Sequence, residues 1–303
     1  GMGRTLIGLI LLATVTSLPE LATGVSAVTL AKAPDLAVGD VLGSCVFNLM
    51  LIGLIDFFWS PKPILSEAQA GHILSAGFGI LLIGLAAWGI LFGAHAGEGG
   101  DPWIGTITPL IFALYLIAAR QVFRFERKRM EEFVRAEAET LRYQEISEQM
   151  ARRKILFYAG VIVAGGIWLP FIGIRISEAT GWGNTFVGNL LIAASTSLPE
   201  IVTSFTALRL AAPDLAVANL FGSNLFDMAI LAIDDLFYVQ GPLLSDVSSN
   251  HLISAISAMM MTGIGITGLI YRAEKKVWAT VSWDGAALLI LYLLNAYFLF
   301  TRG

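Results

Sequence analysis

The sequence has few of the residues on which disulfide-stabilised proteins, thiolate metal centres and soluble domains depend. Cys45 is the only cysteine among 303 residues, which excludes a disulfide framework and a thiolate cluster. Only 14% of the residues are charged and 56% are hydrophobic, whereas a soluble domain carries roughly 25% charged residues. The composition therefore excludes a soluble globular class.

Long apolar runs recur along the whole chain. A run of about 20 apolar residues is long enough to cross about 30 Å of hydrocarbon as a helix. The sequence contains nine such runs, at 6–30, 36–58, 70–94, 103–122, 155–175, 186–210, 215–237, 252–271 and 277–300. We therefore expect an all-α polytopic membrane protein with nine transmembrane helices.

The basic residues are concentrated in one segment. Ten of the 19 Lys and Arg residues lie between Arg120 and Lys154, which by the positive-inside rule predicts that the segment 123–154 is a charged cytoplasmic linker. Threading the other helices from there leaves 16 basic residues inside and three outside. This pattern predicts a multi-pass protein of the plasma (inner) membrane. The expected partner of such a protein is the lipid bilayer. No nucleic acid or protein partner is expected.

The chain contains an internal repeat. Residues 1–30 match residues 181–210 at 14 positions, and residues 33–48 match 212–227 after one deletion. In the expected topology the run 6–30 leads outward and its counterpart leads inward, so the repeats are inverted. Such repeats are typical of secondary transporters, whose substrate site lies near the bilayer midplane. The predicted organisation is a first repeat at 1–122, the linker at 123–154 and a second repeat at 155–303.

The segment TSLPE occurs in both halves, at Thr16–Glu20 and Thr196–Glu200. A proline inside a helix removes one hydrogen bond, which here frees the carbonyl of Val15 or Ser195. A carboxylate at the bilayer centre costs about 2.5–3.5 kcal/mol on insertion scales, and the nearby runs contain no basic residue to pair with it. Carboxylates, hydroxyls and carbonyls are hard oxygen ligands suited to Na⁺ or Ca²⁺. The two segments therefore predict a cation site.

A second polar motif follows each TSLPE segment. Ser44 and Asn48 are four residues apart and share a helix face, as do Ser223 and Asp227. If these helices converge, three acids and one amide surround a common centre, namely Glu20, Asn48, Glu200 and Asp227.

Other residues receive structural interpretations. Gly43 and Gly222 are expected to allow close approach of helix backbones. The three histidines (His72, His95 and His251) and the acids at the ends of apolar runs (Asp56, Asp234 and Asp235) are expected to be interfacial.

On its TSLPE and GS-x-x-x-N/D motifs the chain resembles the calcium/cation antiporter superfamily, and within it the sodium/calcium exchanger type. The resemblance implies that Ca²⁺ and Na⁺ share Glu20 and Glu200, with Asn48 and Asp227 in the same plane. It implies further ligands from Thr16, Thr196, Ser17, Ser197, Ser44 and Ser223 and from the backbone of Ala13 and Ala193. The complete family fold has ten helices, so one N-terminal helix is expected to be missing from this sequence.

The chain also departs from the family at Asp40, which lies opposite Asn219 in the repeat alignment. An acid at this position either adds charge to the ion path or acts as a packing or capping residue. We expect the second role.

The resemblance implies a secondary active antiporter that exchanges Na⁺ for Ca²⁺ by alternating access, with the ions as substrates and without a cofactor. A Ca²⁺(cation)/H⁺ antiporter is an alternative, because three acids can also carry protons. A transport-incompetent fragment of such an exchanger is another. An enzyme is not expected, because the sequence offers no nucleophile or zinc-binding triad beside the paired acids.

Overall fold

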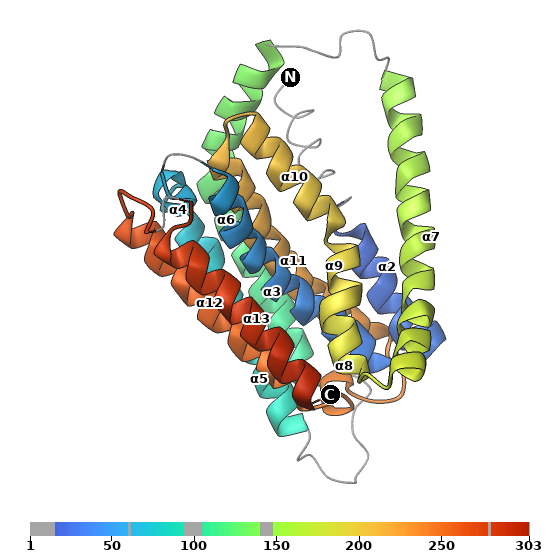
Figure 1. Ribbon diagram of the computed structural model, residues 1–303. Coiled ribbons are helices and arrows are strands. Elements are labelled where there is room, and N and C mark those ends of the chain that lie inside the picture. Colours follow the sequence, from blue (N-terminus) through green and yellow to red (C-terminus); the bar gives the residue numbers. More distant parts are fainter. Residues whose placement is uncertain (1–15, 60–61, 94–104, 140–147, 278–279, 303) are drawn as a thin grey trace.

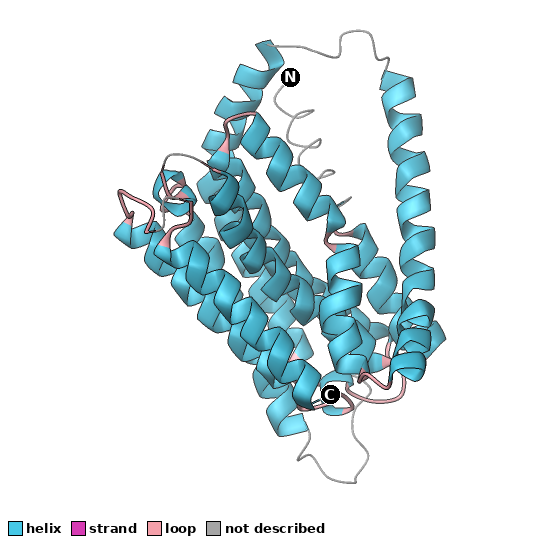
Figure 2. Ribbon diagram, viewed as in Figure 1, coloured by secondary structure: helices cyan, strands magenta, loops and turns pink. Residues whose placement is uncertain are grey.

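The computed structural model describes residues 16–59, 62–93, 105–139, 148–277 and 280–302, and every regular element within these ranges is a helix (Figure 1, Figure 2). The elements are α2 (Leu18–Ser26), η1 (Ala27–Ala31), α3 (Pro34–Phe58), α4 (Ile64–Glu67), α5 (His72–Gly93), α6 (Thr108–Glu139), α7 (Glu148–Thr180), α8 (Asn184–Phe186), η2 (Val187–Ile192), α9 (Ala193–Thr196), α10 (Leu198–Arg209), α11 (Pro213–Phe237), η3 (Leu243–Ser245), α12 (His251–Tyr271) and α13 (Trp283–Arg302). The expected all-helical class is confirmed for the part of the chain that the structure describes.

Six of these helices are long and apolar enough to cross a membrane, namely α3, α5, α7, α11, α12 and α13. The helices Asn184–Thr196 and Leu198–Arg209 form a pair bent by 46°, which makes a seventh span if it is counted as one. Two shorter apolar helices, Leu18–Ala31 and Thr108–Val122, coincide with parts of the expected runs 6–30 and 103–122. Length and composition therefore support six or seven spans among the described residues, where the sequence predicts nine.

The helices α3 and α11 form the core of the molecule and pack against each other. Each has 25 residues and begins with a proline, Pro34 or Pro213, whose fixed φ favours the first helical turn. Near the start of α3, Asp35 accepts a hydrogen bond from a residue beyond the end of α11 (Ser248 N, 2.8 Å). Near the start of α11, Asp214 accepts one from a residue beyond the end of α3 (Gln69 N, 2.8 Å). The two core helices therefore run in opposite directions.

Two histidine–aspartate pairs repeat this exchange between the halves. His72 Nε2 lies 2.7 Å from Asp214 Oδ1, and His251 Nε2 lies 2.9 Å from Asp35 Oδ1. Both histidines are buried inside the protein. Their position at the membrane interface stays a prediction, and His95 lies outside the described residues. Since each pair joins one half of the chain to the other, both contribute to holding the halves together.

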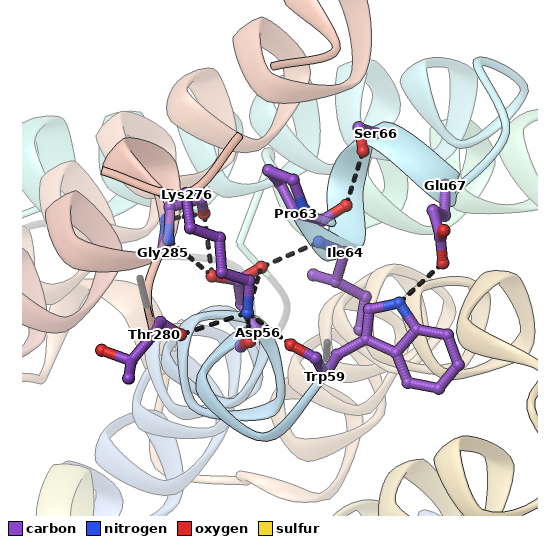
Figure 3. Close-up of polar contacts among 10 residues, drawn as sticks. Asp56, Trp59, Pro63, Ile64, Ser66, Glu67, Lys276, Thr280 and Gly285 are labelled. Carbon is purple, nitrogen blue, oxygen red and sulfur yellow. Dashed lines mark hydrogen bonds and ion pairs between the residues drawn. The ribbon is translucent and has the colours of Figure 1, made fainter. Parts of the chain in front are cut away.

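The end of α3 is tied to the loop between α12 and α13 by a buried acid and a lysine (Figure 3). Asp56 accepts hydrogen bonds from the backbone of Ile64 (2.8 Å) and from the backbone and hydroxyl of Ser282 (2.8 and 2.9 Å). Lys276 donates to the carbonyls of Asp56 and Trp59, and its Nζ lies 3.8 Å from the Asp56 carboxylate. Asp56 therefore caps backbone amides inside the protein, and its position at the membrane interface stays a prediction.

The end of α11 is held by a similar acid. Asp235 accepts hydrogen bonds from the backbone of Leu243 (2.5 Å) and Gly105 (3.2 Å), and it is buried inside the protein. Beyond it, Tyr238 donates to the Asp246 carboxylate at 3.0 Å. Burial and this carboxylate raise the pKa of Tyr238 to about 12, so its hydroxyl remains a donor at neutral pH.

The charged linker extends the membrane helices on either side of it. The helix α6 continues to Glu139, and α7 begins at Glu148. The described parts of the segment 123–154 are therefore helical, as its i,i+4 charge pairs indicate.

Candidate functional site

The second TSLPE segment forms a break between two helices. The helix α9 ends at Thr196 and α10 begins at Leu198, so Pro199 occupies the first turn of α10, where a missing N–H leaves no hydrogen bond unmade. The first copy is similar, because α2 begins at Leu18 after Ser17. The prolines thus start helices instead of interrupting them. Val15, whose carbonyl was expected to be freed, lies outside the described residues.

The three predicted acids come from both halves of the chain, and all three are buried. Glu20 on α2, Glu200 on α10 and Asp227 on α11 are 2%, 1% and 1% exposed. The carboxyl group of Glu20 lies within electrostatic reach of those of Glu200 and Asp227. Ionised carboxylates repel one another in a medium of low dielectric constant, and either protonation or a bound cation would relieve this repulsion.

Hydroxyl groups connect the acids to the core helices. The Ser223 hydroxyl donates to Glu200 Oε1 at 3.2 Å, and the Ser197 hydroxyl donates to that of Ser44 at 3.1 Å. The second contact joins α3 to the break between α9 and α10. Residues predicted from different repeats are therefore in direct contact.

Thr196 forms a hydrogen bond with an acid that is not one of the predicted ligands. Its hydroxyl donates to Asp40 Oδ1 at 2.7 Å, and Asp40 is fully buried. Of the other expected ligands, Thr16, Ser17 and Ala193 are buried, and Ala13 lies outside the described residues.

An amide network crosses between α3 and α11 at the same level. Asn48 Nδ2 donates to Asn224 Oδ1 (3.0 Å), and Asn224 Nδ2 donates to the Cys45 carbonyl (3.2 Å). The Cys45 thiol lies 3.7 Å from Asp227 Oδ2. The sequence analysis missed Asn224. Two signals were available: Asn224 follows Ser223 directly, and it corresponds to Cys45 in the same repeat alignment that pairs Asp227 with Asn48.

Several oxygens of this cluster have no hydrogen-bond partner although they are buried. They are Glu20 Oε2, Glu200 Oε2, Asn48 Oδ1 and Asp40 Oδ2. A buried polar atom left without a partner costs about 1–3 kcal/mol, and more if it is charged. These oxygens come from both halves of the chain.

Glycine controls how closely the helices around this cluster approach one another. A Cβ atom on Gly43 would lie 2.3 Å from the Asn189 carbonyl oxygen and 2.8 Å from the Ala193 Cβ, so only glycine fits at this contact. A Cβ on Gly222 would have no atom within 4 Å. The expected close approach is confirmed at Gly43 and is wrong at Gly222.

No group of three His, Cys, Asp or Glu side chains with metal-binding geometry occurs in the part of the chain that the structure describes. The candidate site instead mixes carboxylate, amide and hydroxyl groups. Oxygen donors of this kind suit Na⁺ and Ca²⁺ better than transition metals.

Comparison with known proteins shows which family the chain belongs to. A family described as "Sodium/calcium exchanger protein" matches residues 1–120 and 155–301. The sodium/calcium exchanger MaX1 of Methanosarcina acetivorans is 26% identical over 328 residues, covering 99% of this chain and 90% of that protein. The inner membrane protein YrbG of Escherichia coli is 26% identical over 314 residues, covering 93% and 88%.

Solved structures show a similar fold. The sodium-calcium exchanger NCX_Mj aligns with a TM-score of 0.54 at 21% identity, covering 97% of this chain and 86% of that one. YfkE aligns with a TM-score of 0.62 at 19% identity, covering 99% and 87%. At these identities the alignments support a common fold and carry no statement about which ions are bound.

Proposed function

The chain belongs to the sodium/calcium exchanger family, and on this basis we propose that it exchanges Na⁺ for Ca²⁺ across a membrane. Membership of this family supports Ca²⁺ transport by cation exchange. The choice of Na⁺ as the second ion is our proposal, and it is supported by the oxygen-only character of the candidate site.

The observation that carries the proposal is the set of partnerless oxygens at the centre of the molecule. Glu20 and Glu200 each present one such oxygen, and Asn48 presents another. One Ca²⁺ or several Na⁺ would satisfy the same oxygens and offset the repulsion between the acids. Competition for one set of ligands couples the two ions, because binding of one excludes the other.

The proposed ligands are those that the motifs indicate. They are Glu20, Glu200, Asn48, Asp227, Thr16, Thr196, Ser17, Ser197, Ser44, Ser223, and the carbonyls of Ala13 and Ala193.

We further propose that the halves are inverted repeats that expose the site to each side of the membrane in turn. The opposite directions of α3 and α11 and the reciprocal pairs His72–Asp214 and His251–Asp35 support this arrangement. The basic segment 123–154 supports a cytoplasmic position for the linker, in a plasma (inner) membrane.

Reconstituted transport tests the proposal. Proteoliposomes loaded with Na⁺ are expected to take up Ca²⁺ when the external Na⁺ is removed. Glu20→Gln and Glu200→Gln should each slow uptake by at least about tenfold, since even outer-shell changes cost roughly 10–100-fold in metal affinity. Glu178→Gln, at an exposed position on α7, is the matched control and should not change uptake. Uptake that survives both site substitutions would contradict the proposal.

The same assay separates the Ca²⁺/H⁺ alternative. Uptake driven by a pH gradient without Na⁺, and unaffected by a Na⁺ gradient, would replace Na⁺ with H⁺ as the exchanged ion. Retention of the dependence on Glu20 and Glu200 would then preserve the site and correct only the coupling ion.

A further inference from the structure

Asp234 is a buried acid of α11 that has no role in the proposed exchange site. Its side chain is 0% exposed, and neither carboxyl oxygen has a hydrogen-bond partner. The carboxyl group points at Gly24 of α2, where a Cβ atom would lie 2.2 Å from Oδ2. Gly24 lies four residues after Glu20 on the same helix face. Glycine therefore leaves the room into which this acid projects.

Asp40 faces the same region from α3. One of its oxygens accepts the Thr196 hydroxyl at 2.7 Å, and the other has no partner. The Asp40 carboxyl group lies within electrostatic reach of both Asp234 and Glu20. These two acids therefore lie on one side of the proposed site, near the start of α3 and the end of α11.

Neither acid has an acidic counterpart in the other repeat. At the offset of 179 that relates α3 to α11, Asp234 corresponds to Ile55 and Asp40 corresponds to Asn219. The neighbouring Asp235 corresponds to Asp56, and both of these cap backbone amides. The extra charge at Asp234 and Asp40 thus occurs at one end of the site only, and it has no counterpart at the other end.

We propose that Asp40 and Asp234 form an accessory binding site for a hard cation, beside the exchange site and on one side of it. When ionised, the two carboxylates with their three partnerless oxygens provide ligands and negative charge and contain no donor of their own. Their partnerless oxygens could be satisfied by hydrogen-bond donors or by a cation. In the part of the chain that the structure describes, neither acid forms an ion pair with a basic side chain. A cation supplies the missing charge and contacts the oxygens directly.

This site gives the two ends of the ion path different chemistry. An ion on its way to Glu20 would first meet Asp40 and Asp234 on one side, and Asn219 and Ile55 on the other. The accessory site would therefore raise the local concentration of cations on one side of the exchange site, whichever ions are exchanged there.

Equilibrium binding of radioactive Ca²⁺ to the purified full chain, in detergent with choline replacing Na⁺, tests the proposal. With the exchange site disabled by Glu20→Gln and Glu200→Gln, saturable Ca²⁺ binding is expected to remain. Adding Asp234→Asn should weaken this residual binding at least tenfold, whereas adding Glu178→Gln should leave it unchanged. In the otherwise unaltered chain, Asp234→Asn should still support Na⁺-driven Ca²⁺ uptake.

A second measurement separates a binding role from a structural one. Without Ca²⁺, Asp234→Asn should unfold at the same or a higher temperature, because it removes a buried and unpaired carboxyl group. A lower unfolding temperature, or residual Ca²⁺ binding that Asp234→Asn does not affect, would overturn the accessory site. If Asn is not tolerated, Asp234→Ile reproduces the residue of the other repeat and carries the same expectations.

Loss of all Ca²⁺ binding with Glu20→Gln and Glu200→Gln alone would overturn the accessory site and leave the exchange site intact. No binding by the unaltered chain would overturn both.

Discussion

Buried acids serve different roles in this protein, and the partners of each carboxyl group decide the role. Asp56 and Asp235 accept backbone N–H groups at the ends of the core helices. Glu20 and Glu200 each keep an oxygen without a partner. The satisfied acids hold helix ends in place, whereas the unsatisfied oxygens of Glu20 and Glu200 are the ones that the proposed function assigns to the transported ion.

Lys276 provides a test at the residue scale. Its ammonium group is nearly buried and contacts two carbonyls and the carboxylate at the end of α3 (Figure 3). Lys276→Met should destabilise the protein by roughly 3–5 kcal/mol, because it leaves the buried Asp56 carboxylate without its cation. Thermal unfolding in detergent measures the effect. Lys275→Met, at an exposed position, is the control, and equal unfolding temperatures for the two variants would contradict the role of Lys276.

At the scale of elements, the site depends on how closely the helices approach one another. The close contact between α3 and the segment Val187–Thr196 places the Ser44 hydroxyl against that of Ser197. Gly43 makes this contact possible because it has no side chain to separate the two backbones. Helix packing in membranes uses small residues in the same way.

A pair of glycine substitutions tests this packing. Gly43→Ala should cost about 1–3 kcal/mol from overpacking and reduce Ca²⁺ uptake, because the Cβ would collide with the Asn189 carbonyl. Gly222→Ala should be neutral or up to about 1 kcal/mol stabilising, since alanine favours the helix and space is available. Thermal unfolding and proteoliposome uptake measure both effects. Equal behaviour of the two variants would show that the α3 contact does not limit the site.

At the scale of the whole molecule, the two halves are joined by contacts that each half supplies to the other. The pairs His72–Asp214 and His251–Asp35 lie between the halves, and the amide network between α3 and α11 lies at the centre. Neither half contains the complete candidate site, because Glu20 and Glu200 belong to different halves. The site therefore requires assembly of both halves.

The proposed inversion of the repeats predicts the sides of two equivalent loops. Lys62 follows α3 and Val239 follows α11, and both are exposed. A cysteine at Lys62 should react with a membrane-impermeant thiol reagent only from the cytoplasmic side, and a cysteine at Val239 only from the opposite side. The native Cys45 is buried and should remain unlabelled in intact cells. Labelling of both positions from the same side would exclude inverted repeats.

The sequence by itself predicted the helical class and the family, and its motifs singled out Glu20, Glu200 and Asp227, which the structure buries. These features depend on composition and on motifs that can be aligned along the chain. It could not assign roles to His72, His251 and Asp56, because their partners lie more than 100 residues away or beyond a loop. It also treated Gly43 and Gly222 as equivalent, although only one of them meets another backbone.

Tertiary structure alone decided which polar groups are satisfied. Alignment reveals that Asp40 and Asp234 lack acidic counterparts, but only packing determines that Asp234 projects against Gly24 with both oxygens unpaired. Local sequence fixes the type of each side chain. Its donors, acceptors and neighbours come from helices distant along the chain, and these contacts form only when the helices pack together.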